Sequence, residues 1–129
     1  MARAPAERKR LGAQAEDAAC ALLQRNGLQL LACNARYPFG EIDSIFQDGA
    51  TIVFVEVRFR RSMQFGGAAV SIDTGKRRKI ALAAQAWLSA HPQWRKAACR
   101  FDVVAVSMQA QALHCDWMRA AFTLDDLGA

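Results

Sequence analysis

The stretch from Gly40 to Arg61 constrains the fold most, because it reads as two alternating strands joined by a tight turn. Asp48-Gly49 is typical of a two-residue hairpin turn, since both residues tolerate a positive φ. On the second strand, every other side chain shares a face. That alternation places Glu56 and Arg58 together on one face of a strand that is otherwise apolar on both sides.

The predicted hairpin register brings acidic side chains together. With Asp48-Gly49 as the turn, Glu41 pairs with Glu56, and Asp43 lies one diagonal step from Glu56, roughly 7–8 Å away between backbones. Like charges placed opposite one another are destabilising. A divalent cation would offset that repulsion, so the pattern predicts a site for Mg²⁺ or Mn²⁺.

Length and charge bound the class of protein. The chain has 129 residues and a net charge of +5, which fits a single domain over residues 1–129 with an anionic partner. We favour nucleic acid over a membrane, since no segment approaches the roughly 20 apolar residues of a membrane span. No signal peptide is visible, and we expect a cytoplasmic protein. The four cysteines form no C-x-x-C pair, which favours reduced thiols over a zinc site.

The remaining periodicities predict an α/β fold with a mixed sheet flanked by helices. Beyond the hairpin, helices are expected over residues 9–26 and 74–90, and strands over 28–36, 99–108 and 112–118. We expect residues 1–8 to be flexible. Residues 62–72 are expected to form a mobile loop beside the acidic patch, which closes over a substrate or is a plain surface connection.

Three charged features outside the hairpin have two interpretations each. The second helix opens with Lys76-Arg77-Arg78-Lys79, although each cation near a helix N-terminus costs about 0.3–1 kcal/mol. A bound phosphate would reverse that sign, and the alternative is a solvated basic run. Glu16 flanks the apolar stripe of the first helix and either faces the acidic patch or solvent. Asp102, a single acid in an apolar strand, is expected to pair with an arginine rather than to act in catalysis.

Acids on one strand followed by Glu-x-basic on the next suit phosphodiester hydrolysis. Carboxylates hold a metal ion that lowers the pKa of a bound water and neutralises the phosphate. A neighbouring cation such as Arg58 then stabilises the transition state. Surrounding basic residues bind the nucleic-acid backbone without reading its sequence. The residues that we assign to this role are Arg60, Arg61, Lys76, Arg77, Arg78 and Lys79.

Several of these motifs together resemble the YraN-like family, bacterial proteins that are similar to Holliday-junction resolvases. The matching segments are Gly40-Glu41-Ile42-Asp43, Phe54-Val55-Glu56-Val57-Arg58, Phe65-Gly66, Lys76-Arg77-Arg78 and Arg100-Phe101-Asp102-Val103. The resemblance implies a restriction-endonuclease-like fold with an α-β-β-β-α-β core. It also implies a PD-(D/E)xK nuclease site and, as in resolvases, a homodimer that acts on branched DNA.

The resemblance also implies roles for single residues. Asp43 and Glu56 match the metal ligands, together with the backbone carbonyl of Val57. Glu16 matches the helix carboxylate of resolvases, and Glu41 is a supporting acid. The chain departs from the family at Arg58, where a lysine is usual. Arginine cannot act as a base near neutral pH, although it can hold a phosphate or orient a water.

Three functions remain open from the sequence. The first is a Mg²⁺- or Mn²⁺-dependent endonuclease acting on structured or branched DNA. The second is a nucleic-acid-binding module with a degenerate, non-catalytic site. The third is a protein-interaction scaffold, which would leave the converging acids and the basic helix start unexplained.

Overall fold

The computed structural model describes residues 5–60 and 72–122. Its element order confirms the predicted α-β-β-β-α-β core, followed by one more strand. The elements are α1 (Pro5–Arg25), β1 (Gln29–Tyr37), β2 (Gly40–Asp48), β3 (Thr51–Arg60), α2 (Thr74–Ala90), the 3-10 helix η2 (Pro92–Trp94), β4 (Ala98–Gln109) and β5 (Ala112–Phe122). Helix α1 begins within the stretch expected to be flexible. Arg61 and the expected loop, apart from Ile72, lie outside the described residues.

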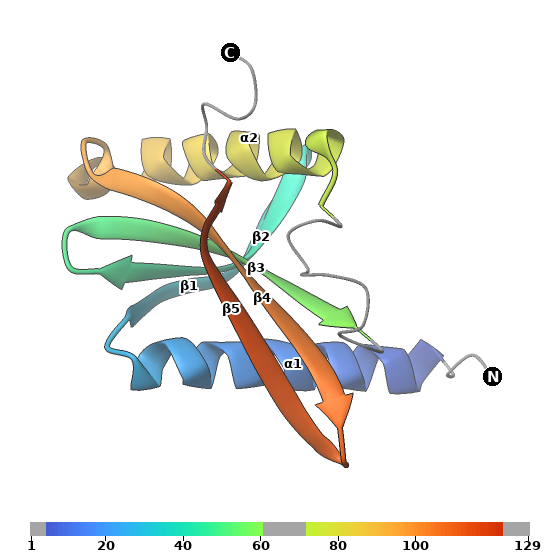
Figure 1. The fold of residues 1–129 in the computed structure, drawn as a ribbon. Helices are drawn as coiled ribbons and strands as arrows, with labels where there is room; N and C mark the ends of the chain where they lie inside the picture. Colours follow the sequence, from blue (N-terminus) through green and yellow to red (C-terminus); the bar gives the residue numbers. More distant parts are fainter. Residues whose placement is uncertain (1–4, 61–71, 123–129) are drawn as a thin grey trace.

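The sheet is mixed and lies between the two helices, as Figure 1 shows. Its strands follow the order β1-β2-β3-β4-β5. Strands β3 and β4 are parallel, and the other neighbouring pairs are antiparallel. A parallel pair needs a crossover connection, and the segment that contains α2 supplies it. This α/β arrangement confirms the predicted fold class and is compatible with a restriction-endonuclease-like core.

Helix α1 covers one face of the sheet through small side chains. Ala15, Ala19 and Leu23 are buried against the sheet, and Leu22 packs partly buried against the same cluster. The helix ends as predicted at Gly27, whose φ is +89°. The N–H of Leu28 then donates to the carbonyl of Leu23, which is a common helix stop.

Helix α2 covers the other face with the stripe that its sequence predicts. Ile80, Ala83, Ala84 and Trp87 are all buried in a core shared with the aromatic side chains of the sheet. The Trp87 ring meets Phe54 edge-on, with 6.1 Å between the ring centroids. Both faces of β3 are therefore covered, which explains why its sequence is apolar on both sides.

The β2–β3 turn corrects the predicted register. Asp48 pairs with Thr51, so the turn residues are Gly49 and Ala50 rather than Asp48 and Gly49. Asp48 stays in the strand, where its carboxylate accepts a hydrogen bond from Arg100 Nη1 at 2.8 Å. The pairing moves by two residues, an even number, so the predicted alternation of faces survives.

The corrected register changes which acidic residue lies opposite Glu56. The ladder runs from Asp48–Thr51 to Ser44–Val55, and its next step would place Asp43 opposite Glu56. The predicted pairing of Glu41 with Glu56 is therefore wrong. Asp43, not Glu41, lies level with Glu56.

At one point along β1 and β2, the side chains that should stay on one side of the sheet switch to the other side. Cys33 and Ser44 pair and line a cavity on the α1 side. Two residues along, Ala35 and Ile42 also pair, but they pack in the core on the α2 side. Regular alternation would have kept all four on one face. Asn34, between these pairs, has a left-handed φ of +52°, and this local conformation accompanies the reversal.

Beyond this level β2 leaves β3 and approaches α2, as Figure 1 shows. The paired ladder of the two strands ends at Ser44 and Val55. At the far end of β2, Gly40 touches the helix so closely that an added Cβ would lie 2.5 Å from the Lys79 carbonyl oxygen. The split between the two strands begins where Asp43 stands.

Two further expectations concern the described residues. None of the helices in residues 5–60 and 72–122 is long and apolar enough to cross a membrane. The four cysteines all lie within these ranges and carry free thiols.

Candidate functional site: an acidic cleft between β2, β3 and α2

Asp43 bridges the split between the two strands. Its Oδ2 accepts a hydrogen bond of 2.8 Å from the backbone N–H of Val57. That N–H lies beyond the last paired rung of the β2–β3 ladder. The Val57 N–H therefore donates to the Asp43 side chain at a point where β2 and β3 are no longer paired. This hydrogen bond holds Asp43 beside β3.

Asp43 and Glu56 form a carboxyl pair in which Glu56 is buried and Asp43 is half-buried. The Glu56 side chain is only 6% exposed. Burial raises the pKa of Asp43 to about 8, with further contributions from a hydrogen bond to Glu56 and from repulsion by its charge, while the Val57 N–H acts in the opposite direction. Without a metal ion, Asp43 therefore holds a proton near neutral pH. Two acids that share a proton at close range are a common arrangement in functional sites.

Among the described residues, the cation nearest to Glu56 comes from α2. Lys76 Nζ lies 2.7 Å from Glu56 Oε2, whereas Arg58 Nη1 lies 4.0 Å from the same oxygen. The Lys76 contact is an ion pair without good hydrogen-bond geometry, because Glu56 Oε2 is buried and accepts no hydrogen bond in the described part of the chain. The predicted neighbour Arg58 is thus present, but a residue that we assigned to backbone binding is closer.

The pair opens into a cleft of about 470 Å³ between the start of β2, β3 and the start of α2. Both acidic and basic side chains line it. The lining residues are Gly40, Glu41, Asp43, Glu56, Asp73, Gly75, Lys76, Lys79 and Ile80. A smaller cavity of about 100 Å³ lies on the α1 side and also reaches Asp43, so this carboxylate touches both spaces.

The two other predicted acids lie at the margins. Glu41 turns toward Arg36, with Oε1 at 3.4 Å from the Arg36 Nε, and is partly exposed. Glu16 lines the small cavity together with Asp43. Burial raises the pKa of Glu16, and repulsion by Glu41 adds to the effect. Glu16 is therefore close to the carboxyl pair, while Glu41 belongs to the rim.

The predicted basic residues divide between the cleft and other surroundings. Lys76 and Lys79 line the cleft, and Arg78 is exposed on α2. Arg77 points elsewhere, since its Nε donates to the Ile72 carbonyl at 3.0 Å and its guanidinium lies 5.4 Å from the centroid of the Phe122 ring. Arg60 is partly buried and lies opposite Ser107 on β4.

Asp73 lines the cleft, although it was not among the predicted site residues. Its Oδ1 accepts a hydrogen bond of 2.7 Å from the Lys76 N–H, which makes it the N-cap of α2. A cap at this position places Lys76 at the third residue of the helix. Helical side chains lean toward the N-terminus, so the cap was a usable signal that Lys76 faces the cleft.

Comparison with known sequences identifies the family. The sequence model for the family described as "Uncharacterised protein family UPF0102" matches residues 15–106. This chain belongs to the UPF0102 family. It is 52% identical over 122 residues to a UPF0102 protein of Xanthomonas campestris, covering 95% of this chain and 98% of the relative. It is 47% identical over 111 residues to a UPF0102 protein of Stutzerimonas stutzeri, covering 86% of this chain and 92% of the relative. The resemblance to the YraN-like family is thereby confirmed.

We tested whether the UPF0102 cleft suits a metal ion. Within residues 5–60 and 72–122, no group of three or more His, Cys, Asp and Glu side chains is arranged to hold one. Mg²⁺, however, is commonly held by one or two carboxylates, with waters and substrate phosphates completing its shell. Asp43 and Glu56 supply two such carboxylates, and the buried Glu56 Oε2 faces the Lys76 ammonium group but accepts no hydrogen bond in the described part of the chain. The pair fits a partly hydrated Mg²⁺ or Mn²⁺. The Val57 carbonyl as a ligand stays a prediction.

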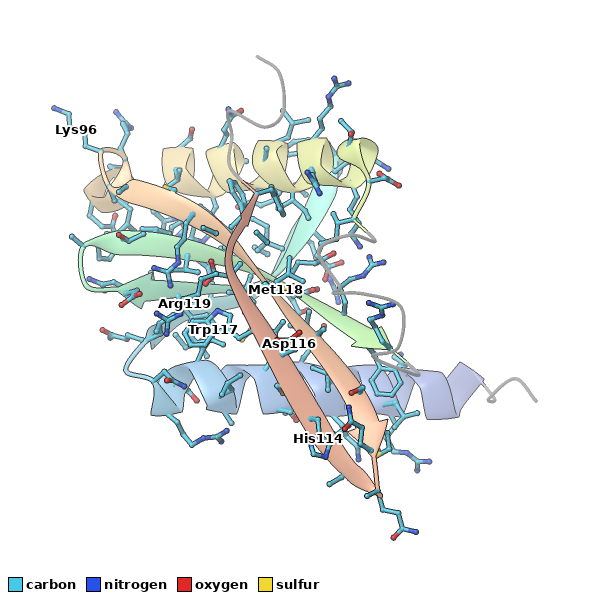
Figure 2. The ribbon with its side chains drawn as sticks, viewed as in Figure 1. Lys96, His114, Asp116, Trp117, Met118 and Arg119 are labelled. Atoms are coloured by element: carbon cyan, nitrogen blue, oxygen red, sulfur yellow. The ribbon has the colours of Figure 1, made fainter. Side chains whose placement is uncertain are left out.

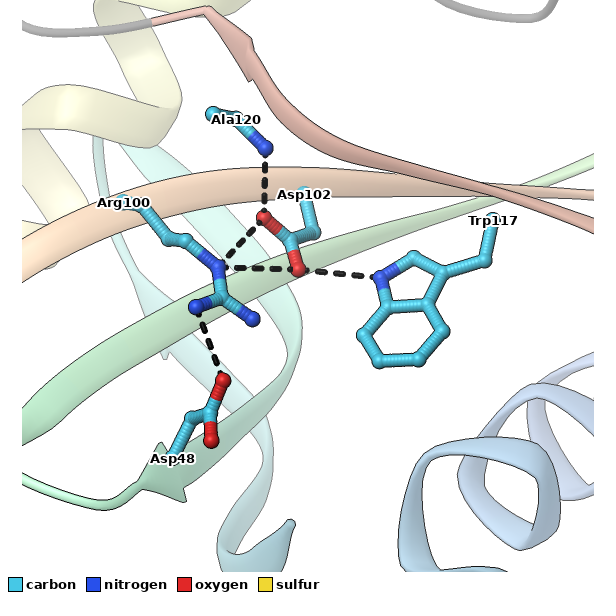
Figure 3. Close-up of polar contacts among 5 residues, drawn as sticks. All are labelled: Asp48, Arg100, Asp102, Trp117 and Ala120. Carbon is cyan, nitrogen blue, oxygen red and sulfur yellow. Dashed lines mark hydrogen bonds and ion pairs between the residues drawn. The ribbon is translucent and has the colours of Figure 1, made fainter. Parts of the chain in front are cut away.

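A second acidic cluster in the UPF0102 chain has a different character (Figure 3). The Asp102 carboxylate is fully buried and accepts hydrogen bonds from Arg100 Nε at 3.1 and 3.3 Å, from Trp117 Nε1 at 2.9 Å and from the Ala120 N–H at 2.9 Å. On the outer side of the same tryptophan, the Arg119 guanidinium lies 4.0 Å from the ring centroid, and Figure 2 shows the two side chains together on β5. The predicted pairing of Asp102 with an arginine is confirmed.

Proposed function

We propose that this UPF0102 protein is a divalent-metal-dependent endonuclease that hydrolyses phosphodiester bonds in structured or branched DNA. The observation that carries the proposal is the close pair of Asp43 and Glu56 at the strand split, in which the buried Glu56 Oε2 accepts no hydrogen bond among the described residues and the pair opens to a cleft with basic residues. Buried, underpaired acids in a cleft are typical of sites that bind a ligand.

Each residue of the cleft has a chemical part in this proposal. Asp43 and Glu56 would hold the metal ion, and the Val57 N–H keeps the Asp43 carboxylate in place. Bound there, Mg²⁺ or Mn²⁺ would lower the pKa of a water and neutralise charge on the phosphate. Lys76, Lys79 and the other basic residues would attract the DNA backbone, which is a sequence-independent and salt-sensitive interaction.

The fold and the family add context to the proposal. The sheet-and-helix core is compatible with a nuclease-type site, and the family description names neither an activity nor a substrate. As part of the proposal, the protein works in the cytoplasm, where bacterial DNA lies. A homodimer would match the two-fold symmetry of a branched junction.

Cleavage assays on the full chain test the proposal. Linear duplex, forked and four-way DNA would be incubated with Mg²⁺, with Mn²⁺ and with a chelator. We expect metal-dependent cleavage that falls at least about 100-fold in Asp43→Asn and Glu56→Gln. Asp116→Asn is the matched control, since this carboxylate is exposed on β5 and outside the cleft. Equal cleavage by all three variants would contradict the proposal.

A second candidate is a nucleic-acid-binding module that does not cleave. The observation that favours it is Arg58, which stands where the related site usually has lysine and cannot give up a proton. In that case no metal would support cleavage, and salt-sensitive DNA binding would survive Asp43→Ala. If Arg58→Lys then produced cleavage, the arginine would be what silences the site. Absence of both binding and cleavage would favour a protein-interaction scaffold.

A further inference from the structure

Two cations approach the same buried oxygen from different elements. Lys76 Nζ, from α2, is 2.7 Å from Glu56 Oε2, and Arg58 Nη1, from the same strand as Glu56, is 4.0 Å away. At the shorter distance the attraction between unit charges is larger, and Glu56 is screened little by water. The principal counter-charge of Glu56 is therefore a helix residue.

The fold holds Lys76 in this position at its backbone. The Asp73 side chain caps α2 through the Lys76 N–H, at 2.7 Å. At its other end the Lys76 side chain is 46% exposed and lies in the cleft, whereas the Glu56 side chain is 6% exposed. Lys76 thus connects solvent in the cleft with a buried carboxylate.

Lys79 provides an internal comparison, because it lies one helical turn further along and lines the same cleft. Among the ion pairs between described residues, none involves Lys79. The two lysines share a charge, a helix and a cleft but differ in their relation to Glu56. A difference between their variants would therefore report on the Glu56 contact.

We infer that Lys76 is the working cation of the acidic centre, in the role that the sequence pattern gives to Arg58. In the metal-free chain, its ammonium group neutralises Glu56. When Asp43 and Glu56 hold a metal ion, the ammonium group is released into the cleft and contacts the scissile phosphate. A lysine suits this exchange, since it is a compact charge with three donors on a flexible stem. The second part of this inference depends on the proposed function.

Metal binding tests the first part without any cleavage. Mn²⁺ would be titrated into the full-length wild type, Lys76→Met, Lys79→Met and Arg58→Met, with calorimetry or electron paramagnetic resonance as the readout. We expect Lys76→Met to bind Mn²⁺ about tenfold more tightly, because no ammonium group competes for Glu56. Lys79→Met should stay within about threefold of the wild type, since it removes no ion pair to Glu56. Arg58→Met should tighten Mn²⁺ binding less than Lys76→Met, because the distance from its guanidinium to Glu56 is longer, 4.0 Å.

Cleavage of branched DNA tests the second part with the same variants. We expect the cleavage rate of Lys76→Met to fall about 100-fold despite tighter Mn²⁺ binding, because the cation that stabilises the transition state is gone. Arg58→Met should lose less than about tenfold. Lys76→Arg should recover part of the loss, since it restores a cation to the cleft.

Different failures lead to different conclusions. Unchanged Mn²⁺ affinity in Lys76→Met, or no Mn²⁺ binding by any variant, would overturn the inference. A larger loss of cleavage in Arg58→Met than in Lys76→Met would also overturn it. Absence of cleavage in the wild type, with tighter Mn²⁺ binding in Lys76→Met, would sink the proposed nuclease function and leave the counter-ion role supported. If Lys76→Met unfolds because Glu56 is left uncompensated, Lys76→Gln takes its place in both assays.

Discussion

The sheet carries two buried acidic centres that differ in how many donors reach them. Asp102 on β4 accepts hydrogen bonds from a guanidinium, an indole and a backbone N–H. Asp43 on β2 accepts one backbone N–H and lies against another acid, Glu56. The partner of Asp102 is an arginine beside it on the same strand, while the nearer of the two ion-pair partners of Glu56 comes from a helix that lines a cleft.

This difference separates a structural acid from a candidate functional one. Both Asp102 oxygens accept hydrogen bonds, so this carboxylate has little left to offer a ligand, although Arg100 Nη2 beside it is buried without a hydrogen-bond partner among the described residues. When two neighbouring acids have few hydrogen-bond donors, the pKa of one of them is raised. Their oxygens are then available as ligands for a metal ion. Exposure to a cleft then decides whether a ligand can reach the acid; the Asp43–Glu56 pair lines a cleft, whereas Asp102 is fully buried.

Removing the Asp102 carboxylate, and with it the hydrogen bonds that it accepts, should have the largest effect on stability. Asp102→Ala would leave the Arg100 charge without its buried partner and two N–H donors without an acceptor. We expect the free energy of unfolding to fall by about 3–5 kcal/mol, the usual result of removing one partner of a buried ion pair. Urea denaturation followed by circular dichroism measures it. A loss under about 1 kcal/mol would show that the network is not structural.

Closing the split between β2 and β3 should have the next largest effect. An added Cβ at Gly40 would lie 2.5 Å from the Lys79 carbonyl oxygen, so Gly40→Ala must push the strand away from α2. We expect a loss of about 1–3 kcal/mol, as for other overpacked sites. Gly12→Ala is the control, because an added Cβ there meets no atom within 4 Å. Equal stability of the two variants, measured by thermal unfolding, would contradict the close contact.

Near the Asp43–Glu56 pair, the free energy of unfolding should change with pH in the opposite direction from that expected for an acid paired with a cation. The pKa of Asp43 is raised from 3.8 to about 8, so between these values the folded chain holds a proton that the unfolded chain has lost. Its stabilising contribution is complete below pH 3.8 and is lost as pH rises through about 8. In chelator-treated protein, we expect Asp43→Asn to be more stable than the wild type at pH 8.5 by about 1–3 kcal/mol.

The control for this titration is the same pair of proteins at pH 5, where the difference should shrink because Asp43 is protonated. Saturating Mn²⁺ should also stabilise the wild type more than Asp43→Asn at pH 8.5, since only the wild type offers both carboxylates. Equal pH profiles for the two proteins would mean that Asp43 titrates normally. The measurement is the thermal midpoint across the pH series.

The smallest effect on stability should come from removing one of the hydrogen-bond donors to Asp102. Trp117→Phe deletes the indole N–H that donates to Asp102 at 2.9 Å and keeps an aromatic ring. Because Asp102 retains its other donors, we expect a loss of about 1 kcal/mol in the free energy of unfolding. A loss as large as that of Asp102→Ala would mean that the tryptophan, rather than the aspartate, organises the cluster.

Local pattern in the sequence was sufficient for the architecture and the main acids. Alternation along β3 and the stripe along α2 predicted both elements, because periodicity follows from the geometry of each element alone. Asp43 and Glu56 were identified together because a register error of two residues preserves faces. The same error placed Glu41 in the wrong position, since the assignment of Asp48 depends on Arg100, 52 residues away.

Only the tertiary structure decided how the acids are paired. The left-handed Asn34, the contact of Gly40 with α2 and the bond from Val57 to Asp43 together form the split. The approach of Lys76 to Glu56 depends on how α2 docks on the sheet. The sequence by itself determined which residues carry charge and which face of a strand they share. Their partners were set by packing between distant segments, because a short-range ion pair forms only where the fold brings both groups within a few ångströms.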